Sequence, residues 1–404
     1  MGNTPNIRFK GFTDDWEQRK LGDTVQITMG QSPDGSTYSE TPSDYILVQG
    51  NADLKDGWVS PRVWTSQMTK KADAGDLIMS VRAPAGAMGK TAYNAVIGRG
   101  VAAIKGNEFI YQSLVKMDSN GYWKKLSSGS TFESLNSNNI KDAEIFVPCD
   151  EEQQKIGQYF SNLDNLITLH QRKCDETKKL KKFMLQKMFP KKDAKKPEIR
   201  FAGFTDDWEQ RKLGEICQRV IRKNKNNESD LPLTIASQYG LIDQRDFFNK
   251  VVAAKDMSNY YLLRKGEFAY NKSYSNGFEY GSIKRLNAYE QGCLSTLYIC
   301  FEITSDEVDS DYLECFFDTL KWYGDLSMIC AEGARNHGLL NVDIKAFFAD
   351  INVSTPTNLK EQRKIATYLN NLDHLITLHR RAYYNKKGGL TNVHNDNQQH
   401  YAIL

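Results

Sequence analysis

The sequence predicts an α+β protein in which two mixed α/β bodies are separated by long coiled-coil-forming helices, arranged as a pseudo-two-fold internal repeat. Three observations predict this fold class. The stretch Asp150–Phe189 has helical periodicity and contains no proline. A segment that starts at Ile7 returns almost unchanged at Ile199, and another that starts at Glu152 returns at Glu361. The chain is therefore predicted to consist of two halves built on one frame.

The central stretch is predicted to be one long helix. Its apolar residues recur every three or four positions, which is the spacing of a coiled-coil seam. About thirty to forty helical residues at roughly 1.5 Å each make a rod of about 45–60 Å. A rod of this length can hold two bodies at a set separation. The seam residues are Ile156, Phe160, Leu163, Ile167, Cys174, Leu180, Met184 and Met188.

Each half has a constant opening segment, a variable body and a constant closing helix. The opening segment reads IRFKGFTDDWEQRKLGDT in the first half and IRFAGFTDDWEQRKLGEI in the second. The closing helix begins EQQKIGQYFSNLDNLITLHQR and EQRKIATYLNNLDHLITLHRR. The bodies, about 23–148 and 215–356, share almost no residues. This contrast favours a frame that sets geometry around bodies that read a target, although recent duplication with uneven drift is an alternative.

The bodies are predicted to be compact α+β domains, because short strand-like runs are separated by Gly and Pro and followed by a helical run. The predicted strands lie at 44–54, 75–84, 91–106, 266–286 and 293–303, and the predicted helices at 108–126 and 310–326. We expect these divisions: 1–149, first body; 150–198, spacer helix and linker; 199–357, second body; 358–387, truncated second helix; 388–404, irregular tail.

The second closing helix follows the first only to about Arg381. Gly388, Gly389 and the Asn-rich residues after them are predicted to stop the helix. A truncation, a shifted reading frame or an appended tail would each explain the difference.

Composition excludes several classes of protein. The net charge of +3 is too small to indicate a nucleic-acid partner by itself. No apolar run is long enough to span a membrane, and the N-terminus lacks a signal-peptide core, so we expect a cytoplasmic protein without membrane contact. Seven scattered cysteines without CxxC spacing indicate free thiols rather than disulfides or a zinc site.

The sequence offers no recognisable catalytic motif. The segment Gly86–Thr91 resembles part of a phosphate-binding loop, but the first glycine of that pattern is replaced by Pro84, which has no amide proton. No two prolines are adjacent, which removes the usual signature of amino-methyltransferases. His170 and His379 take equivalent helix positions and are interpreted as seam residues. We therefore expect no catalytic residues and no metal site.

Basic, polar and aromatic side chains in the bodies are candidates for DNA contact, because Arg and Lys can bond guanine edges and Asn and Gln adenine edges. For each residue, a solvated surface side chain is the alternative. The candidates are Gln31, Ser32, Tyr38, Arg62, Arg82, Lys90, Arg99, Ser130, Thr131, Arg222, Lys223, Asn224, Lys225, Asn271, Lys272, Ser273, Tyr274, Arg335, Asn336 and His337.

The stretch Gln171–Arg200 is strongly basic, with twelve Lys and Arg against four Asp and Glu. A solvated helix face explains it most simply. Two functional interpretations are also open. The stretch could attract phosphate groups, an interaction that weakens with salt, or it could dock an acidic partner.

The repeated motifs identify a family. The twin IRFxGFTDDWEQRKLG segments, the twin LN…IK…P…EQxxI…LDxLITLH segments and the ending KKLKKFMLQKMFP resemble the specificity (S) subunit of type I restriction-modification systems, over nearly the whole chain to Arg381. The resemblance implies that each body is a target-recognition domain for one half of a bipartite double-stranded DNA site. It also implies that the chain is not an enzyme.

The resemblance further implies partners. Two methylation subunits would bind the constant helices, restriction subunits would join the full complex, and S-adenosylmethionine, ATP and Mg would act on those partner subunits. The truncated second helix predicts a weakened contact with one methylation subunit. A free-standing adaptor that joins two proteins is the competing interpretation. The candidate partner-binding residues are Ile156, Phe160, Leu163, Ile167, Leu180, Met184, Ile365, Leu369, Leu372 and Ile376.

Overall fold

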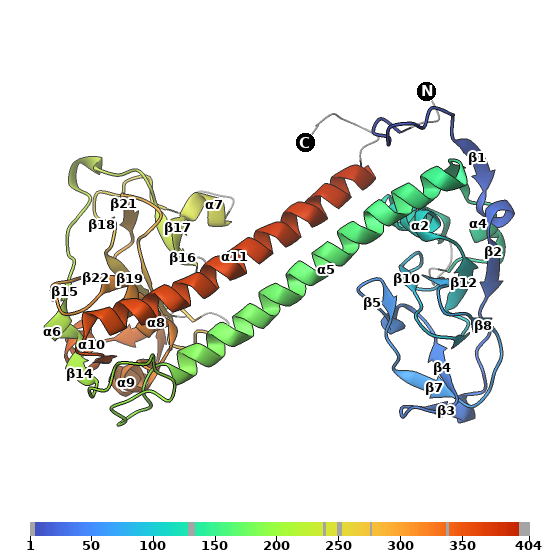
Figure 1. Ribbon diagram of the computed structural model, residues 1–404. Coiled ribbons are helices and arrows are strands. Elements are labelled where there is room, and N and C mark those ends of the chain that lie inside the picture. Colours follow the sequence, from blue (N-terminus) through green and yellow to red (C-terminus); the bar gives the residue numbers. More distant parts are fainter. Residues whose placement is uncertain are drawn as a thin grey trace. The chain divides into compact units, whose positions relative to one another are not determined.

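The computed structural model describes residues 5–127, 134–236, 240–248, 253–274, 277–336 and 339–395, and gives the backbone alone for 331–336, 339 and 385–395. The chain divides into two compact units. The first combines residues 1–171 with 380–404, and the second comprises 172–379. The division falls within the two long helices, α5 (Asp150–Lys187) and α11 (Leu359–Asn395) (Figure 1).

The first unit is built on two sheets. A six-stranded sheet has the order β2-β12-β9-β10-β6-β5, and a five-stranded sheet has the order β3-β7-β4-β11-β8. A separate antiparallel ribbon joins β1 to β13. The elements are β1 (Glu17–Lys20), α1 (Leu21–Thr24), β2 (Gln26–Met29), β3 (Tyr38–Ser39), β4 (Tyr45–Val48), β5 (Leu54–Lys55), β6 (Trp58–Val59), β7 (Val63–Thr65), β8 (Lys71–Ala72), β9 (Leu77–Ser80), β10 (Met88–Lys90), β11 (Ala95–Ile97), β12 (Val101–Lys105), α2 (Glu108–Ser119), α3 (Tyr122–Ser127), α4 (Ser137–Lys141) and β13 (Glu144–Val147).

The second unit has a smaller central sheet. Its four strands take the order β15-β22-β19-β20, and the hairpins β16–β17 and β23–β24, the pair β18–β21 and the ribbon β14–β25 surround them. The elements are β14 (Glu209–Lys212), α6 (Leu213–Ile216), β15 (Cys217–Arg219), β16 (Leu233–Ala236), β17 (Gly240–Asp243), α7 (Gln244–Phe248), β18 (Tyr261–Arg264), β19 (Phe268–Asn271), β20 (Ser282–Arg285), β21 (Gln291–Leu294), β22 (Ile299–Ile303), α8 (Ser310–Asp318), α9 (Tyr323–Ile329), β23 (Cys330–Asn336), β24 (Leu339–Val342), α10 (Ile344–Asp350) and β25 (Asn352–Thr355).

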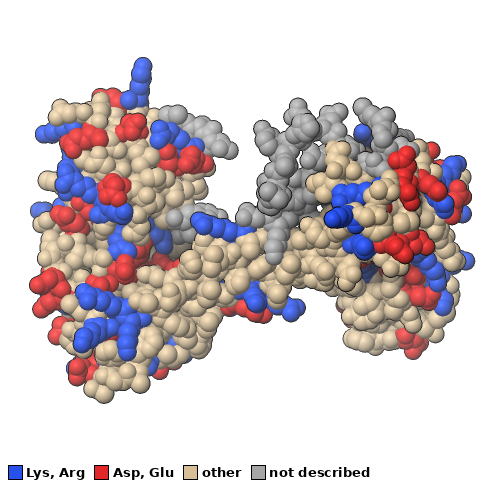
Figure 2. All heavy atoms as spheres, turned by 45° about the horizontal axis from the view of Figure 1, so that its top comes forward, with Lys and Arg blue, Asp and Glu red and all other residues tan. Residues whose placement is uncertain are grey.

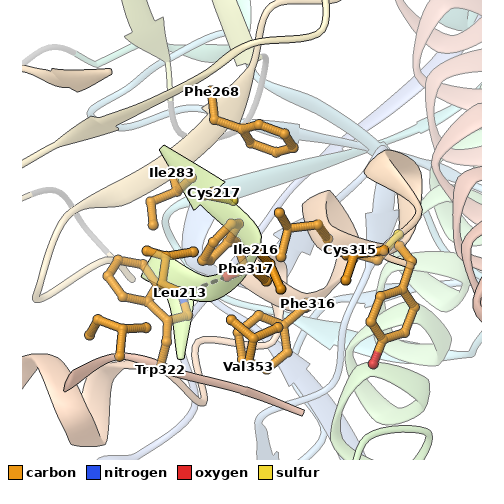
Figure 3. Packing of buried hydrophobic residues seen from close by; sticks show 14 of the residues in the cluster. Leu213, Ile216, Cys217, Phe268, Ile283, Cys315, Phe316, Phe317, Trp322 and Val353 are labelled. Atoms are coloured by element: carbon orange, nitrogen blue, oxygen red, sulfur yellow. Dashed lines mark hydrogen bonds between the residues drawn. The ribbon is translucent and has the colours of Figure 1, made fainter. Parts of the chain in front are cut away.

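Aromatic residues dominate the core of the second unit. Phe317 packs edge-on against Phe268 of the sheet, and Phe316 and Trp322 both contact Phe317 (Figure 3). The indole N–H of Trp322 donates to the carbonyl of Phe317 at 3.0 Å, so the buried polar group is satisfied. Each predicted strand segment contains at least one strand, and the α+β prediction is confirmed.

The two helices predicted within the bodies are each interrupted. The run 108–126 forms α2 and α3, because Gly121 adopts a positive φ of 70° that ends the first helix. The run 310–326 forms α8 and α9, and Leu320 between them has a φ of 59°. The break turns Lys321 toward the end of α5, where its ammonium donates to the carbonyls of Phe189 and Pro190. A cation at these carbonyls fixes the helix end to the second unit.

The prediction of one long central helix is confirmed, since α5 is continuous over Asp150–Lys187. Within the second unit, α5 and α11 run antiparallel. The thiol of Cys174 donates to the carbonyl of Ile376 at 3.7 Å, and the Lys181 ammonium contacts Asp373 at 2.8 Å. Lys181 also bonds Asp318 of α8 at 3.0 Å, so one buried cation ties both helices to the body.

The prediction that glycine stops the second closing helix is wrong. Helix α11 continues through Gly388 and Gly389 to Asn395. A glycine inside a helix costs about 1 kcal/mol relative to alanine, which weakens a helix without ending it. The long helical stretch before the glycines has already met the cost of nucleation.

The constant segments of each half contact one another in the same way. Arg8 forms a two-pronged ion pair with Glu152, both contacts at 2.7 Å. Arg200 repeats it with Glu361 at 2.7 and 2.9 Å. In both pairs the carboxylate is almost fully buried. The opening segment and the start of the closing helix therefore form one clamp, which explains why both ends of each half are repeated.

Two further contacts belong to the clamp. Phe9 packs edge-on against Tyr159, with ring centroids 6.0 Å apart, and Phe201 packs in the same way against Tyr368 at 6.1 Å. The side chain of Gln153 donates to the carbonyl of Pro148. Gln362 makes the equivalent bond to Pro356.

Candidate nucleic-acid interface

In the first unit, several loops converge where strands end. We call residues 30–32, 49–53, 60–62, 81–82 and 98–100 the first junction. The amide of Gly30 donates to the carbonyl of Val101, that of Gly98 to Val48 and that of Val81 to Gly100. The Ser60 amide donates to the carbonyl of Asp53. These bonds place segments that are distant in sequence beside one another.

Glycine makes this convergence possible. A Cβ atom on Gly30 would lie 2.1 Å from the carbonyl oxygen of Gly98, and one on Gly100 would lie 2.0 Å from that of Gln49. Both distances are far inside van der Waals contact, so a larger residue would force the loops apart.

Three candidate arginines, Arg62, Arg82 and Arg99, lie in the first junction. Arg62 is held by Asp53, whose Oδ1 accepts from Nε at 2.9 Å and pairs with Nη2 at 2.8 Å. The backbone amide of Arg99 donates to the hydroxyl of Ser32 at 3.1 Å, and its guanidinium reaches the same oxygen at 3.4 Å. Gln31 is exposed beside Ser32. The structure therefore brings Gln31, Ser32, Arg62 and Arg99 together.

The other candidates of the first body have different surroundings. Arg82 belongs to the first junction and is exposed, and the Tyr38 hydroxyl donates to the carbonyl of Pro33, which follows Ser32. Lys90 lies elsewhere, paired with Glu108 at 2.9 Å and stacked on Trp58 and Tyr111. It is a packing residue. Ser130 and Thr131 lie outside the described residues.

In the second unit, two candidate groups meet. We call residues 271–274 and 280–281 with the hairpin β23–β24 the second junction. The Leu340 amide donates to the carbonyl of Lys272 at 3.1 Å, which joins the hairpin to the loop. The Asn271 side chain accepts from the amide of Ser273 at 3.0 Å. Tyr274 is 54% exposed.

Lys272 is the cation of the second junction whose side chain the structure describes. Burial lowers the pKa of its ammonium, so a bound anion would relieve the unfavourable desolvation. Arg335 and Asn336 lie on β23, where only the backbone is described, opposite Leu340 and Leu339. His337 lies outside the described residues.

The remaining candidates, 222–225, lie near the opposite end of β19, about 13 Å from Asn271 along the strand. Arg222 pairs with the buried Glu267 at 3.0 Å. Lys223 stacks on Tyr261, and the buried Asn224 bonds Ser229 in both directions. Three of the four therefore stabilise the fold. Lys225 alone is exposed.

The helix candidates divide by burial. Ile365, Leu369, Leu372 and Ile376 are at most 8% exposed, so they serve packing within the chain and are unavailable to a partner. Ile156, Phe160, Leu163, Ile167 and Met184 are half-buried, and Leu180 is 41% exposed.

Four exposed leucines were not among the candidates. Leu166 and Leu169 lie on α5, and Leu375 and Leu378 occupy the same repeat positions on α11, each 40–46% exposed. The sequence did contain a signal for them. Both copies have an identical LITL segment, and its leucines lie outside the spacing of the apolar seam. Asp53 was also missed, because nothing in its local sequence distinguishes it from other acidic residues.

Charge on the structure is mixed. On the face that Figure 2 shows, Lys and Arg lie interspersed with Asp and Glu. Within the basic stretch 171–200, seven cations form ion pairs inside the chain, which weakens its interpretation as a phosphate-binding surface. They are Lys178, Lys181, Lys187, Lys191, Lys195, Lys196 and Arg200.

Among the described residues, no group of His, Cys, Asp and Glu is arranged to hold a metal ion. Five of the seven free cysteines are buried.

No helix in the described ranges has the length and apolarity needed to cross a bilayer. The segment Gly86–Thr91 leads through β10 into strand β11.

The fold defines a class of protein, a repeated helical frame with two unlike α/β bodies. It matches the crystal structure of a type I restriction-modification system S subunit from M. genitalium with a TM-score of 0.65, over 99% of this chain and all of that one, at 15% identity. At this identity the likeness shows the fold. The predicted fold is therefore confirmed for both halves.

Sequence comparison matches part of the chain to a known domain family. Residues 13–179 match the family model described as the type I restriction modification DNA specificity domain. The chain therefore carries a domain of that family, and the predicted resemblance is confirmed. It is 30% identical over 179 residues to the MjaX specificity subunit of Methanocaldococcus jannaschii, covering 42% of this chain and 41% of that protein.

The MjaIX specificity subunit of the same organism is 27% identical over 235 residues, 50% of this chain and 52% of the relative. The chain thus spans about half the length of the curated relatives it matches.

Proposed function

We propose that this chain is the non-catalytic DNA-recognition subunit of a type I restriction-modification complex. Each junction reads one half of a bipartite double-stranded site. Methylation subunits bind the long helices, and restriction subunits join the full complex. S-adenosylmethionine, ATP and Mg²⁺ act on those partners.

One observation carries the proposal. Two equivalent clamps, Arg8–Glu152 and Arg200–Glu361, hold bodies that share almost no residues. A frame that is constant around contents that vary suits recognition of two different half-sites. Arg, Lys, Asn, Gln and Ser at the junctions supply donors and acceptors for base edges and phosphates.

A body graft tests DNA recognition within this chain alone. Residues 23–148 replace residues 215–356, so both clamps hold the first body. The graft points are equivalent, because Gln153 bonds Pro148 as Gln362 bonds Pro356. We expect the complex with methylation subunits to modify a site made of two copies of the first half-site, as mapped by sequencing of modified bases.

Retention of the second half-site by the graft would contradict recognition by separate bodies. A gel shift at several salt concentrations, with and without methylation subunits, tests the adaptor alternative. An adaptor would show no DNA binding in either case.

The exposed leucine pairs are the proposed contacts for methylation subunits. Each pair, Leu166 with Leu169 and Leu375 with Leu378, presents apolar side chains three residues apart on one helix face. Since the pairs are equivalent in the repeat, they suit two copies of one partner. This proposal replaces the buried seam residues as the docking surface.

Native mass spectrometry tests the docking surface. We expect Leu166→Glu with Leu169→Glu to lose one methylation subunit, and Leu375→Glu with Leu378→Glu to lose the other, because burying a charge in an apolar contact is costly. Each pair is the control for the other. Two bound methylation subunits on the four-site variant would refute the assignment.

A further inference from the structure

The carboxylate of Asp53 is the most constrained acidic group of the first junction. Its side chain is 3% exposed. Oδ2 accepts from the amides of Gln49 at 2.7 Å and Gly50 at 3.2 Å, and Oδ1 takes both contacts from Arg62. One buried carboxylate therefore fixes the loop 49–53 and one cation.

The exposed cation is aimed by this arrangement. A guanidinium has a side edge, formed by Nε and Nη2, and an outer end, formed by Nη1 and Nη2. Asp53 occupies the side edge of Arg62, whose side chain is 54% exposed. The outer end keeps two N–H donors in parallel, and among the described residues its hydrogen-bond acceptors come from Asp53 alone.

We propose that Arg62 reads a guanine in the first half-site and that Asp53 is the residue that positions it. This inference rests on the proposed function and names a specificity determinant within it. Guanine offers O6 and N7 as adjacent acceptors in the major groove, which match the two donors at the outer end of an arginine.

Base reading fits Arg62 better than phosphate contact. The two bonds to Asp53 restrict rotation of the guanidinium, so its donors keep a fixed direction. The nearby carboxylate also offsets its positive charge, which weakens attraction to phosphate but leaves hydrogen-bond geometry intact. Arg99 differs, because a neutral hydroxyl of Ser32 is its described partner.

The junction also holds Arg62 at a rigid position. The carbonyl of Asp53 accepts from Ser60 at 2.8 Å, two residues before Arg62. Gln49 packs against Gly98 and Gly100 of the turn into β12. Because these hydrogen-bonded loops already hold Arg62 in place, little conformational entropy is lost when it binds DNA.

The experiment uses the full chain with its methylation subunits and a library holding every single-base variant of both half-sites. Bound DNA is sequenced for wild type, Arg62→Lys and Asp53→Asn. We expect preference for guanine at one position of the first half-site to fall about 5- to 100-fold in both variants. Preferences at the second half-site stay unchanged, which provides an internal control.

Lys55→Gln is the matched control for charge. It removes an exposed cation of β5 outside the junction, and every base preference should persist. Thermal unfolding of each variant checks that the first unit is intact. Loss of preference confined to one position in an intact Asp53→Asn protein identifies positioning, since a general structural defect would weaken all positions.

Two outcomes separate the two proposals. If wild type prefers a bipartite site but Arg62→Lys keeps every guanine preference, the inference is overturned and the proposed function stands. If wild type with its methylation subunits shows no preferred site, both fall.

Discussion

Asp164 and Asp373 occupy the same position in the two copies of the closing helix, yet they contact different partners. Asp164 accepts from the Gln112 amide at 2.9 Å. Asp373 pairs with Lys181 at 2.8 Å. Burial raises the pKa of the Asp164 carboxyl. Burial alone would lower the pKa of Lys181, but Asp318 and Asp373 outweigh it and raise that pKa.

We predict that these two aspartates respond oppositely to Asn substitution. Because the folded pKa of Asp164 lies above the unfolded value, ionisation on raising the pH through that window costs stability. Asp164→Asn should therefore be at least as stable as wild type at pH 7, with a flatter pH dependence above pH 4. Asp373→Asn should lose about 1 kcal/mol, since Lys181 keeps only Asp318.

Denaturant unfolding of both variants between pH 4 and 8 checks this contrast. Equal destabilisation by the two substitutions at pH 7 would show that the partner does not decide the outcome.

Only part of the candidate site was predictable from residue type. Arg62, Arg99, Ser32 and Gln31 were expected to contact DNA, and the structure gathers them. Lys90 and Arg222 looked the same in sequence. Glu108 and Glu267 hold them within the fold, and such pairs across the fold leave no local signal.

At the scale of elements, periodicity predicted α5 well, because apolar residues recur in every turn of a long helix that has one packed face. The breaks after α2 and α8 were not predicted. Gly121 was a weak signal for the first break. Leu320 was no signal for the second, because leucine rarely has a positive φ, and here that φ accompanies the contact of Lys321 with the end of α5. The end of α11 was misjudged because a glycine pair was taken as a stop.

The clamp is the element on which each unit depends. We predict that Glu361→Gln destabilises the second unit by about 3–5 kcal/mol, because the largely buried Arg200 keeps its charge but loses the carboxylate that it pairs with. Adding Arg200→Met should recover part of the loss, since both charges are then absent. Chemical denaturation of both variants measures the difference.

Glu152→Gln is the matched control in the first unit. Hydrogen exchange should show loss of protection in the opening segment of the mutated half alone. Equal loss in both halves would contradict separate clamps.

At the scale of the whole molecule, the proposed reader needs a stiff spacer. Helix α5 has 38 residues, which gives about 57 Å. Adding one heptad after Thr177 in α5 and another after His374 in α11 lengthens both helices by about 10 Å and keeps the pairs Cys174–Ile376 and Lys181–Asp373 in register. We predict that the unread spacer grows by about three base pairs while both half-sites persist.

Mapping of modified bases measures the spacer. The heptad in α5 alone is the control, because it displaces Cys174 from Ile376 and should abolish modification. An unchanged spacer in the doubly extended protein would contradict the role of the helices as a ruler.

The twin clamps also bear on how such a protein can acquire new sequence preferences. A genetic crossover between the two copies of the opening segment, or within the closing helix, rejoins residues that already make the same ion pair and ring contact. The exchanged body is therefore flanked by clamp residues that make the same contacts as before. Under the proposed function, one recombination event replaces a whole half-site at once, with no intermediate that must fold around mismatched ends.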